Sequence, residues 1–161
     1  MDIDPTLQQL ITAFGEILQM SGLVLDEDGF CGLQFDSIIP VNIQLDVSNN
    51  TLVLFADLGL LPEERKHALA DAMLRANRFW RATSGATLSL TDDQPAAVIL
   101  ALPLVWERLS AVELSLSVER FVNTAGDWIK ILDEGPGETP PADLTPNPFD
   151  FSRSFHGMIR A

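Results

Sequence analysis

Apolar residues recur every three to four positions over residues 6–20, and this spacing predicts an amphipathic helix at the start of the chain. Gly22 follows shortly afterwards, and glycine readily adopts the left-handed conformation that ends a helix. The apolar positions of this helix are Leu7, Leu10, Ile11, Phe14, Ile17 and Leu18.

The pattern then changes to alternation of apolar and polar residues, which predicts strands with one face in water. Residues 41–47 alternate strictly, and residues 52–56 return after a polar turn. Residues 23–35 resemble a hairpin whose turn contains Asp28 followed by Gly29. We therefore expect three or four antiparallel strands in the first third of the chain.

One long helix is predicted over residues 62–81, with Pro62 at the first helical position, where its missing N–H costs nothing. Leu74 and Phe79 lie off the main apolar stripe, so this helix is apolar on more than one side. We expect one side to pack on the sheet and the excess to meet a second copy of the chain. The stripe consists of Leu69, Ala72, Met73, Ala76 and Trp80.

Two further strands are predicted at residues 86–91 and 96–104, and a last helix at residues 110–132. The order helix, three or four strands, helix, two strands, helix predicts an α+β fold, an antiparallel twisted sheet with helices packed on it. Residues 1–134 would form this domain. Residues 135–161 are a proline-rich linker followed by an apolar tail, for which the alternatives are docking on the domain, docking on a neighbour and a frayed end.

The charge distribution narrows the classes of partner. The 161-residue chain has a formal charge of −13, and no Lys or Arg precedes Arg65. Such an acidic surface repels phosphate backbones and anionic lipids, so we expect neither nucleic-acid binding nor membrane insertion. The acidic first residues lack the positive region of a signal peptide, and a single cysteine suits a reducing compartment. We therefore expect a cytoplasmic protein.

The sequence offers little support for catalysis, a metal or a cofactor. His67 is typical of a solvated helix residue, and His156 lies in the tail. Cys31 occupies an apolar position of a predicted strand, where cysteine usually serves as a small hydrophobe. Neither histidine has a metal ligand at suitable spacing. We expect a binding module rather than an enzyme, with no catalytic residue, no metal and no cofactor.

Several segments, in this order and spacing, resemble the class I type III secretion chaperones of the CesT/Tir chaperone family. Residues 23–33 resemble the family's first hairpin, and residues 49–54 the strand before its central helix. Residues 73–80 and 84–93 resemble the junction between that helix and the next strand. Residues 98–104 resemble a strand that ends in Leu-Pro-Leu, and residues 121–128 resemble the last helix.

The resemblance implies a homodimer formed largely through the central helix, by Leu69, Ala72, Met73, Ala76, Phe79 and Trp80. It also implies that the dimer binds the extended N-terminal segment of a secreted effector and keeps it from aggregating. We expect contacts with that segment at Leu7, Ile11, Leu18, Phe30 and Phe35, although core packing is the alternative for each.

Two alternatives of other classes stay open from the sequence. One is a dimeric module on the same fold that sequesters a partner unrelated to secretion, because a fold does not determine its partner. The other is a small enzyme that uses Cys31 or a pair of carboxylates.

Overall fold

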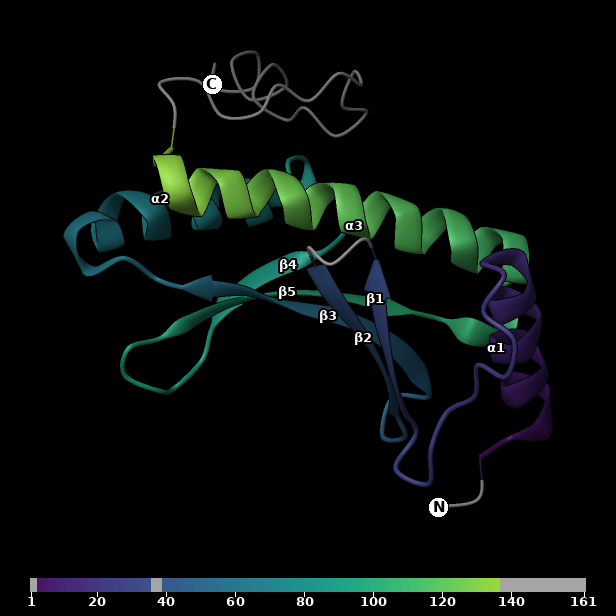
Figure 1. The fold of residues 1–161 in the computed structure, drawn as a ribbon. Coiled ribbons are helices and arrows are strands. Elements are labelled where there is room, and N and C mark those ends of the chain that lie inside the picture. Colours follow the sequence, from purple (N-terminus) through teal and green to yellow (C-terminus); the bar gives the residue numbers. More distant parts are fainter. Residues whose placement is uncertain (1–2, 36–38, 137–161) are drawn as a thin grey trace, which may run out of the picture.

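The computed structural model describes residues 3–35 and 39–136, in which three helices pack on a five-stranded antiparallel sheet (Figure 1). The helices are α1 (Pro5–Ile17), α2 (Lys66–Asn77) and α3 (Ala111–Glu134). The strands are β1 (Phe30–Phe35), β2 (Ile39–Asp46), β3 (Thr51–Leu60), β4 (Thr87–Leu90) and β5 (Ala97–Leu104). The order β1-β2-β3-β5-β4 makes β1 and β4 the edges of the sheet. The predicted α+β fold is confirmed.

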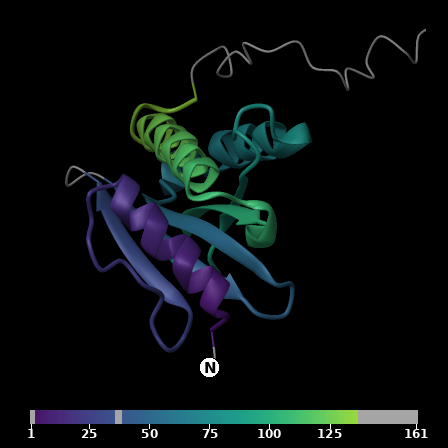
Figure 2. The ribbon, with the colours of Figure 1, turned by 90° about the vertical axis from the view of Figure 1, so that its right-hand side faces the viewer.

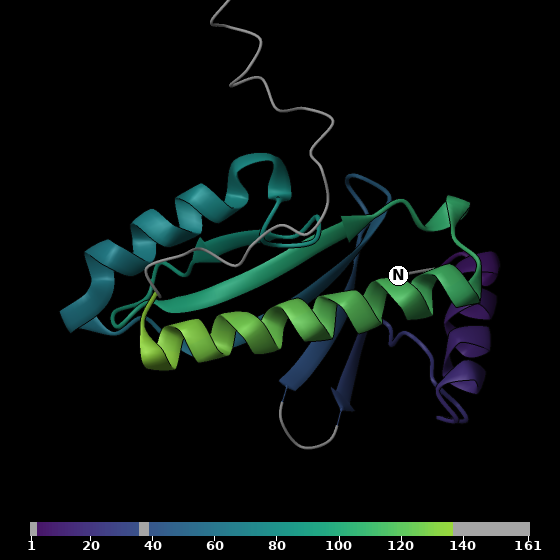
Figure 3. The same ribbon diagram turned by 90° about the horizontal axis from the view of Figure 1, so that it is seen from above.

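The core lies between the sheet and the helices. Alternate residues of β3 and β5, such as Leu54 and Leu100, point toward the helices and are fully buried. Phe121 and Trp128 of α3 belong to the same core. Figure 2 shows α1 crossing the β1–β2 end of the sheet, and Figure 3 shows α3 running across the molecule from beside α2 to α1.

Local signals explain where α1 and α3 begin. The Asp4 side chain accepts the Thr6 N–H at 2.7 Å, and Pro5 takes the first position of α1. At α3, the Ser110 Oγ accepts the Glu113 N–H at 3.2 Å, and the Ser110 N–H donates to Glu113 Oε2 at 2.8 Å. This reciprocal capping box satisfies two amides that a helix start otherwise leaves without a partner.

The central helix is shorter than predicted. A 3₁₀ turn (Glu63–Arg65) precedes α2, and a second one (Arg78–Trp80) follows it. The helix does not continue to Arg81, because Phe79 and Trp80 adopt left-handed φ angles of 59° and 52°. The predicted single helix over residues 62–81 is therefore wrong at both ends.

The predicted first hairpin is also incomplete, because only its second half forms a strand. The segment before the turn is held instead by α1. Gln8 donates from Nε2 to the Leu25 carbonyl at 2.9 Å, and its Oε1 accepts the Leu25 N–H at 3.1 Å. These bonds satisfy the Leu25 backbone outside any strand ladder and place its side chain in the core.

Among the residues described, no helix has both the length and the apolar character to cross a membrane. The helix α3 ends at Glu134, and most of the predicted tail, residues 137–161, lies outside the described residues, so the division into a domain and a tail stays a prediction.

Candidate protein-binding surfaces

The β4 edge of the sheet is partly covered by a side chain and a loop of the same chain. Asn77, at the end of α2, donates from Nδ2 to the Leu88 carbonyl at 2.9 Å. Its Oδ1 accepts the Leu88 N–H, also at 2.9 Å. Ala86 directly precedes β4, and its N–H donates to the Thr83 carbonyl at 2.9 Å. Both outward backbone groups of Leu88, inside this short edge, are thus satisfied, which hinders the pairing of β4 with another strand.

The β1 edge is different, because only its first residue is covered in this way. The Phe30 N–H donates to Asp26 Oδ1, and the Phe30 carbonyl accepts the Asp26 N–H, both at 2.9 Å. Both Phe30 backbone groups therefore point away from β2. In an antiparallel strand this direction alternates, so the backbone groups of Gly32 and Gln34 also point outward. In the described part of the chain, no strand pairs with this side of β1.

Gly32 makes close approach to this edge easier. A Cβ atom at this position would have the Asn42 amide oxygen and the Phe30 ring as its nearest neighbours, at 3.7 Å or more. A glycine inside a strand often marks a place where another backbone comes near. The outer side of β1 at Gly32 and Gln34 is therefore a free edge of this sheet, and we call it the β1 edge.

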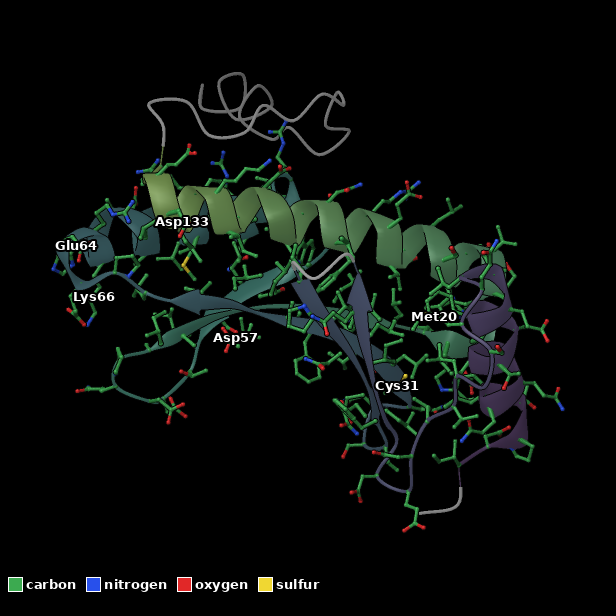
Figure 4. The ribbon with its side chains drawn as sticks, in the orientation of Figure 1. Met20, Cys31, Asp57, Glu64, Lys66 and Asp133 are labelled. Atoms are coloured by element: carbon green, nitrogen blue, oxygen red, sulfur yellow. The ribbon has the colours of Figure 1, made fainter. Side chains whose placement is uncertain are left out.

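Apolar residues lie where the end of α1 and the following loop pass this part of the sheet. Ile17, Met20 and Val24 are exposed, and Leu18 and Leu23 pack half-buried on the core. Figure 4 shows Met20 at the end of α1 beside α3, and Cys31 on the side of β1 that faces α1. We call Ile17, Met20 and Val24 the α1 apolar rim.

The same region is acidic. Glu16 on α1 and Asp26, Glu27 and Asp28 in the turn before β1 are exposed. All basic residues of the chain follow in sequence from Arg65 onward. A segment that carries positive charge between apolar residues would complement this surface.

A second apolar surface lies at the end of α2. Leu74, Phe79 and Trp80 are exposed by 72%, 51% and 54%. Trp80 donates from its indole nitrogen to Thr87 Oγ1 at 3.2 Å, and Trp128 of α3 donates to the Ala82 carbonyl at 3.1 Å. These bonds fix the segment after α2 against β4 and α3, so the two aromatic rings are presented on a supported loop. We call Leu74, Phe79 and Trp80 the α2 aromatic surface.

The left-handed backbone at this surface is costly. A bulky side chain in that conformation costs about 1–2 kcal/mol, because Cβ approaches the following carbonyl oxygen. Two consecutive aromatic residues, Phe79 and Trp80, carry this cost. Strain of this kind persists only where surrounding contacts impose it, and it is concentrated at functional positions.

The structure separates the predicted dimer residues into two groups. Leu69, Met73 and Ala76 are buried in the core of the single chain, and Ala72 is half-buried. Phe79 and Trp80 are exposed, as is the neighbouring Leu74. The structure thus leaves the α2 aromatic surface available for a second copy, and participation of the other residues stays a prediction.

The residues predicted to contact a partner segment are divided in the same way. Leu7 and Ile11 have no exposed surface and pack under α1 in the core. Leu18 and Phe30 are half-buried near the β1 edge, and Phe35 ends β1 with a side chain outside the described part. A helical stripe alone does not tell a core residue from a contact residue. Gly32 and Gln34 were missed, although a glycine inside an alternating strand was a usable signal.

The described residues hold no group of three or more metal-ligating side chains. Cys31 is buried, and burial, assisted by the negative charge of Asp26, raises the pKa of its thiol above the ordinary 9.0. A protonated, buried thiol is a poor nucleophile. The surfaces described above therefore favour binding of a polypeptide over chemistry at Cys31.

Comparison with solved structures places this fold beside several secretion chaperones. A chain of the ExsC–ExsE complex aligns with a TM-score of 0.66 and 23% identity, covering 82% of this chain and 97% of that one. A chain of the HopA1–SchA chaperone–effector complex aligns with a TM-score of 0.63 and 19% identity, covering 83% of this chain and 100% of that one. The Yersinia pestis type III secretion chaperone SycH, solved with a fragment of YscM2, aligns with a TM-score of 0.60 and 22% identity. The alignment covers 75% of this chain and 98% of that one.

Among curated proteins, none matches the sequence significantly. The family model for the Tir chaperone protein (CesT) family, however, matches residues 9–129, which span α1 to most of α3. The resemblance noted in the sequence is thereby confirmed, and the chain belongs to the CesT family of type III secretion chaperones.

Proposed function

We propose that this protein is a cytoplasmic chaperone that binds the N-terminal segment of a secreted effector in extended form, without catalysing a reaction. The observation that carries the proposal is the contrast between the two sheet edges. Asn77 bonds both outward backbone groups of Leu88 in β4, whereas Gly32 and Gln34 leave β1 open beside an apolar rim and an acidic turn. The bound segment would extend the sheet at β1.

Strand addition supplies main-chain hydrogen bonds that demand little of the partner's sequence, and apolar side chains supply selectivity. Ile17, Met20 and Val24 provide exposed apolar area beside α1, and the half-buried Leu18 and Phe30 add to it. A protein that binds only the extended form of a segment lowers the free concentration of that segment and so opposes its collapse or aggregation.

The comparisons support a polypeptide partner. The similar structures include an ExsC–ExsE complex and a HopA1–SchA chaperone–effector complex. These names describe those proteins, but they agree with what the β1 edge offers. The acidic residues of the turn before β1 favour a partner segment that carries Lys or Arg among its apolar residues.

We further propose that two copies associate through the α2 aromatic surface. Leu74, Phe79 and Trp80 expose large apolar side chains, and aromatic residues are enriched in protein interfaces. Phe79 and Trp80 adopt a left-handed backbone that is costly for bulky residues, and about half of each side chain is exposed. A dimer built here leaves both β1 edges accessible, because β1 and β4 lie at opposite edges of the sheet.

A sequestering module without a role in secretion is the alternative, and co-purification from the native host separates the two. Recovery of a secreted protein, bound through its N-terminal region, supports the chaperone. Recovery of a cytoplasmic regulator supports the alternative. A Gln34→Pro variant is the matched negative sample, because it removes the outward N–H of β1, while the N–H groups of Cys31 and Leu33 still face β2.

A further inference from the structure

The C-terminal part of the chain contains a second, independent pattern of strand type. In residues 149–156, Phe149, Phe151, Arg153 and Phe155 alternate with Asp150, Ser152, Ser154 and His156. This period of two places three phenylalanines and Arg153 on one face and only polar residues on the other, a pattern typical of a half-buried strand. A single strand of this kind has no stability unless it adds to an existing sheet.

Within the described residues, the β1 edge is open to such a strand at two consecutive outward positions, Gly32 and Gln34. At β4, Asn77 bonds both outward backbone groups of Leu88. At β1, the outward groups of Gly32 and Gln34 have no neighbouring strand in the described residues. An added strand would carry its apolar face toward the side on which Leu33 is buried and the α1 apolar rim lies.

Charge complementarity also favours the β1 edge as the binding position of this segment. Residues 149–161 carry Arg153 and Arg160 against the single acid Asp150, whereas the whole chain has a charge of −13. The β1 edge lies beside the acidic turn of Asp26, Glu27 and Asp28. The α2 aromatic surface is accompanied instead by Arg75 and Arg78, which would repel this segment.

The intervening chain is long enough to make this contact. The described structure ends at Pro136, next to the end of α3, where Gly135 lies against the Arg65 side chain. Residues 137–148 contain four prolines, and at ~3.1 Å per residue an extended proline-rich segment of this length spans about 37 Å. The 24 residues of α3 span about 36 Å, and Figure 1 shows the end of β1 under the middle of that helix.

We propose that residues 149–155 of this chain bind to its own β1 edge as an added strand and thereby occupy the surface that the effector segment would take. In the unloaded chaperone this segment covers the β1 edge, and it must leave before a partner segment can bind there. This inference shares its surface with the proposed function, and its test needs no effector.

The test is amide hydrogen exchange of the full-length protein, read residue by residue by NMR spectroscopy. The triple variant F149S/F151S/F155S removes the apolar face of the segment. We expect the Gly32 and Gln34 amides to exchange about tenfold faster or more in this variant, since the loss of a docked strand opens both N–H groups to water. The amides of Cys31 and Leu33, which face β2, should exchange equally in both proteins and so report an intact sheet.

The matched control is M158S/I159S, which removes apolar residues of the same tail outside the alternating pattern. This variant should retain the slow exchange of Gly32 and Gln34. Equal exchange of these two amides in the native protein and in the triple variant would overturn the inference. If no secreted protein were recovered with the native chaperone, that result would count against the proposed function and would not alter the exchange measurement.

Discussion

The Asn77 side chain bonds both backbone groups of Leu88, donating to its carbonyl and accepting from its N–H, each at 2.9 Å. This pair links the end of α2 to an edge strand 11 positions further along the chain. It mimics the bonds that a neighbouring strand would supply. One amide side chain thus connects the end of a helix to one edge of the sheet, whereas Gly32 and Gln34 of β1 have no neighbouring strand on their outer side in the described residues.

Replacing Asn77 by Ala should both destabilise the protein and open the β4 edge. Two hydrogen bonds are lost and Leu88 keeps unsatisfied backbone groups, so we expect a loss of about 1–3 kcal/mol in the free energy of unfolding by urea. The newly exposed edge should also increase light scattering on storage. Asn123→Ala, at an exposed position of α3, is the control and should change neither property. Unchanged stability of the Asn77 variant would show that the hydrogen bonds between Asn77 and Leu88 do not stabilise the fold.

The α2 aromatic surface predicts the oligomeric state. We expect the native protein to be a dimer by light scattering at micromolar concentration. The double variant L74D/F79D places charges at exposed positions, so it should be monomeric with an unchanged circular dichroism spectrum. These exposed positions are preferable to Met73, which is buried and would unfold the chain if charged.

The control for dimerisation is V112D/L116D, which places the same charges on the exposed face of α3 and should leave the dimer intact. A native protein that is a monodisperse monomer, or a dimer unaffected by L74D/F79D, would rule out the α2 aromatic surface as the interface.

The capping box predicts a defined dependence of stability on pH. Hydrogen bonds from the Ser110 backbone and then its hydroxyl lower the pKa of Glu113 from its ordinary 4.5. The folded state therefore binds fewer protons than the unfolded state between the lowered value and 4.5, and stability rises with pH across that interval. The contribution is complete above pH 4.5 and is lost as the pH falls through the folded pKa.

Glu113→Gln removes this titration while it keeps a side chain that can serve in a capping box. Urea unfolding from pH 6 to pH 3 should show the native protein losing its advantage over the variant in the acidic part of the range. Parallel stability curves for the two proteins would contradict the assignment.

The elements that the sequence predicted correctly are those whose signals are local. The 3.6-residue period from Leu114 to Leu132 predicted α3, and Ser110 with Glu113 explains where it starts. Alternation from Val41 to Leu45 predicted β2 and its buried face. These patterns need no information from distant parts of the chain, because buried positions recur along each element with the period of that helix or strand.

The errors occurred where distant residues decide the outcome. The end of α2 at Asn77 depends on Leu88, and the irregular course of Leu25 depends on Gln8 of α1. The stripe of α1 correctly identified Leu7 and Ile11 as apolar positions but did not reveal that both are fully buried. Which edge of the sheet is free depends on pairings across the whole fold, so Gly32 and Gln34 emerged only with the topology.

The claim that partner segments add to β1 is tested most directly by the affinity of the recovered effector's N-terminal segment for Gln34→Pro and for Gln34→Ala. Both variants are made in the F149S/F151S/F155S background, so that residues 149–155 do not compete. Calorimetric titration should show Gln34→Ala binding like its parent and Gln34→Pro binding about tenfold more weakly or worse, since proline removes the outward N–H that would pair with the segment. Equal affinities of the two variants would contradict strand addition at β1.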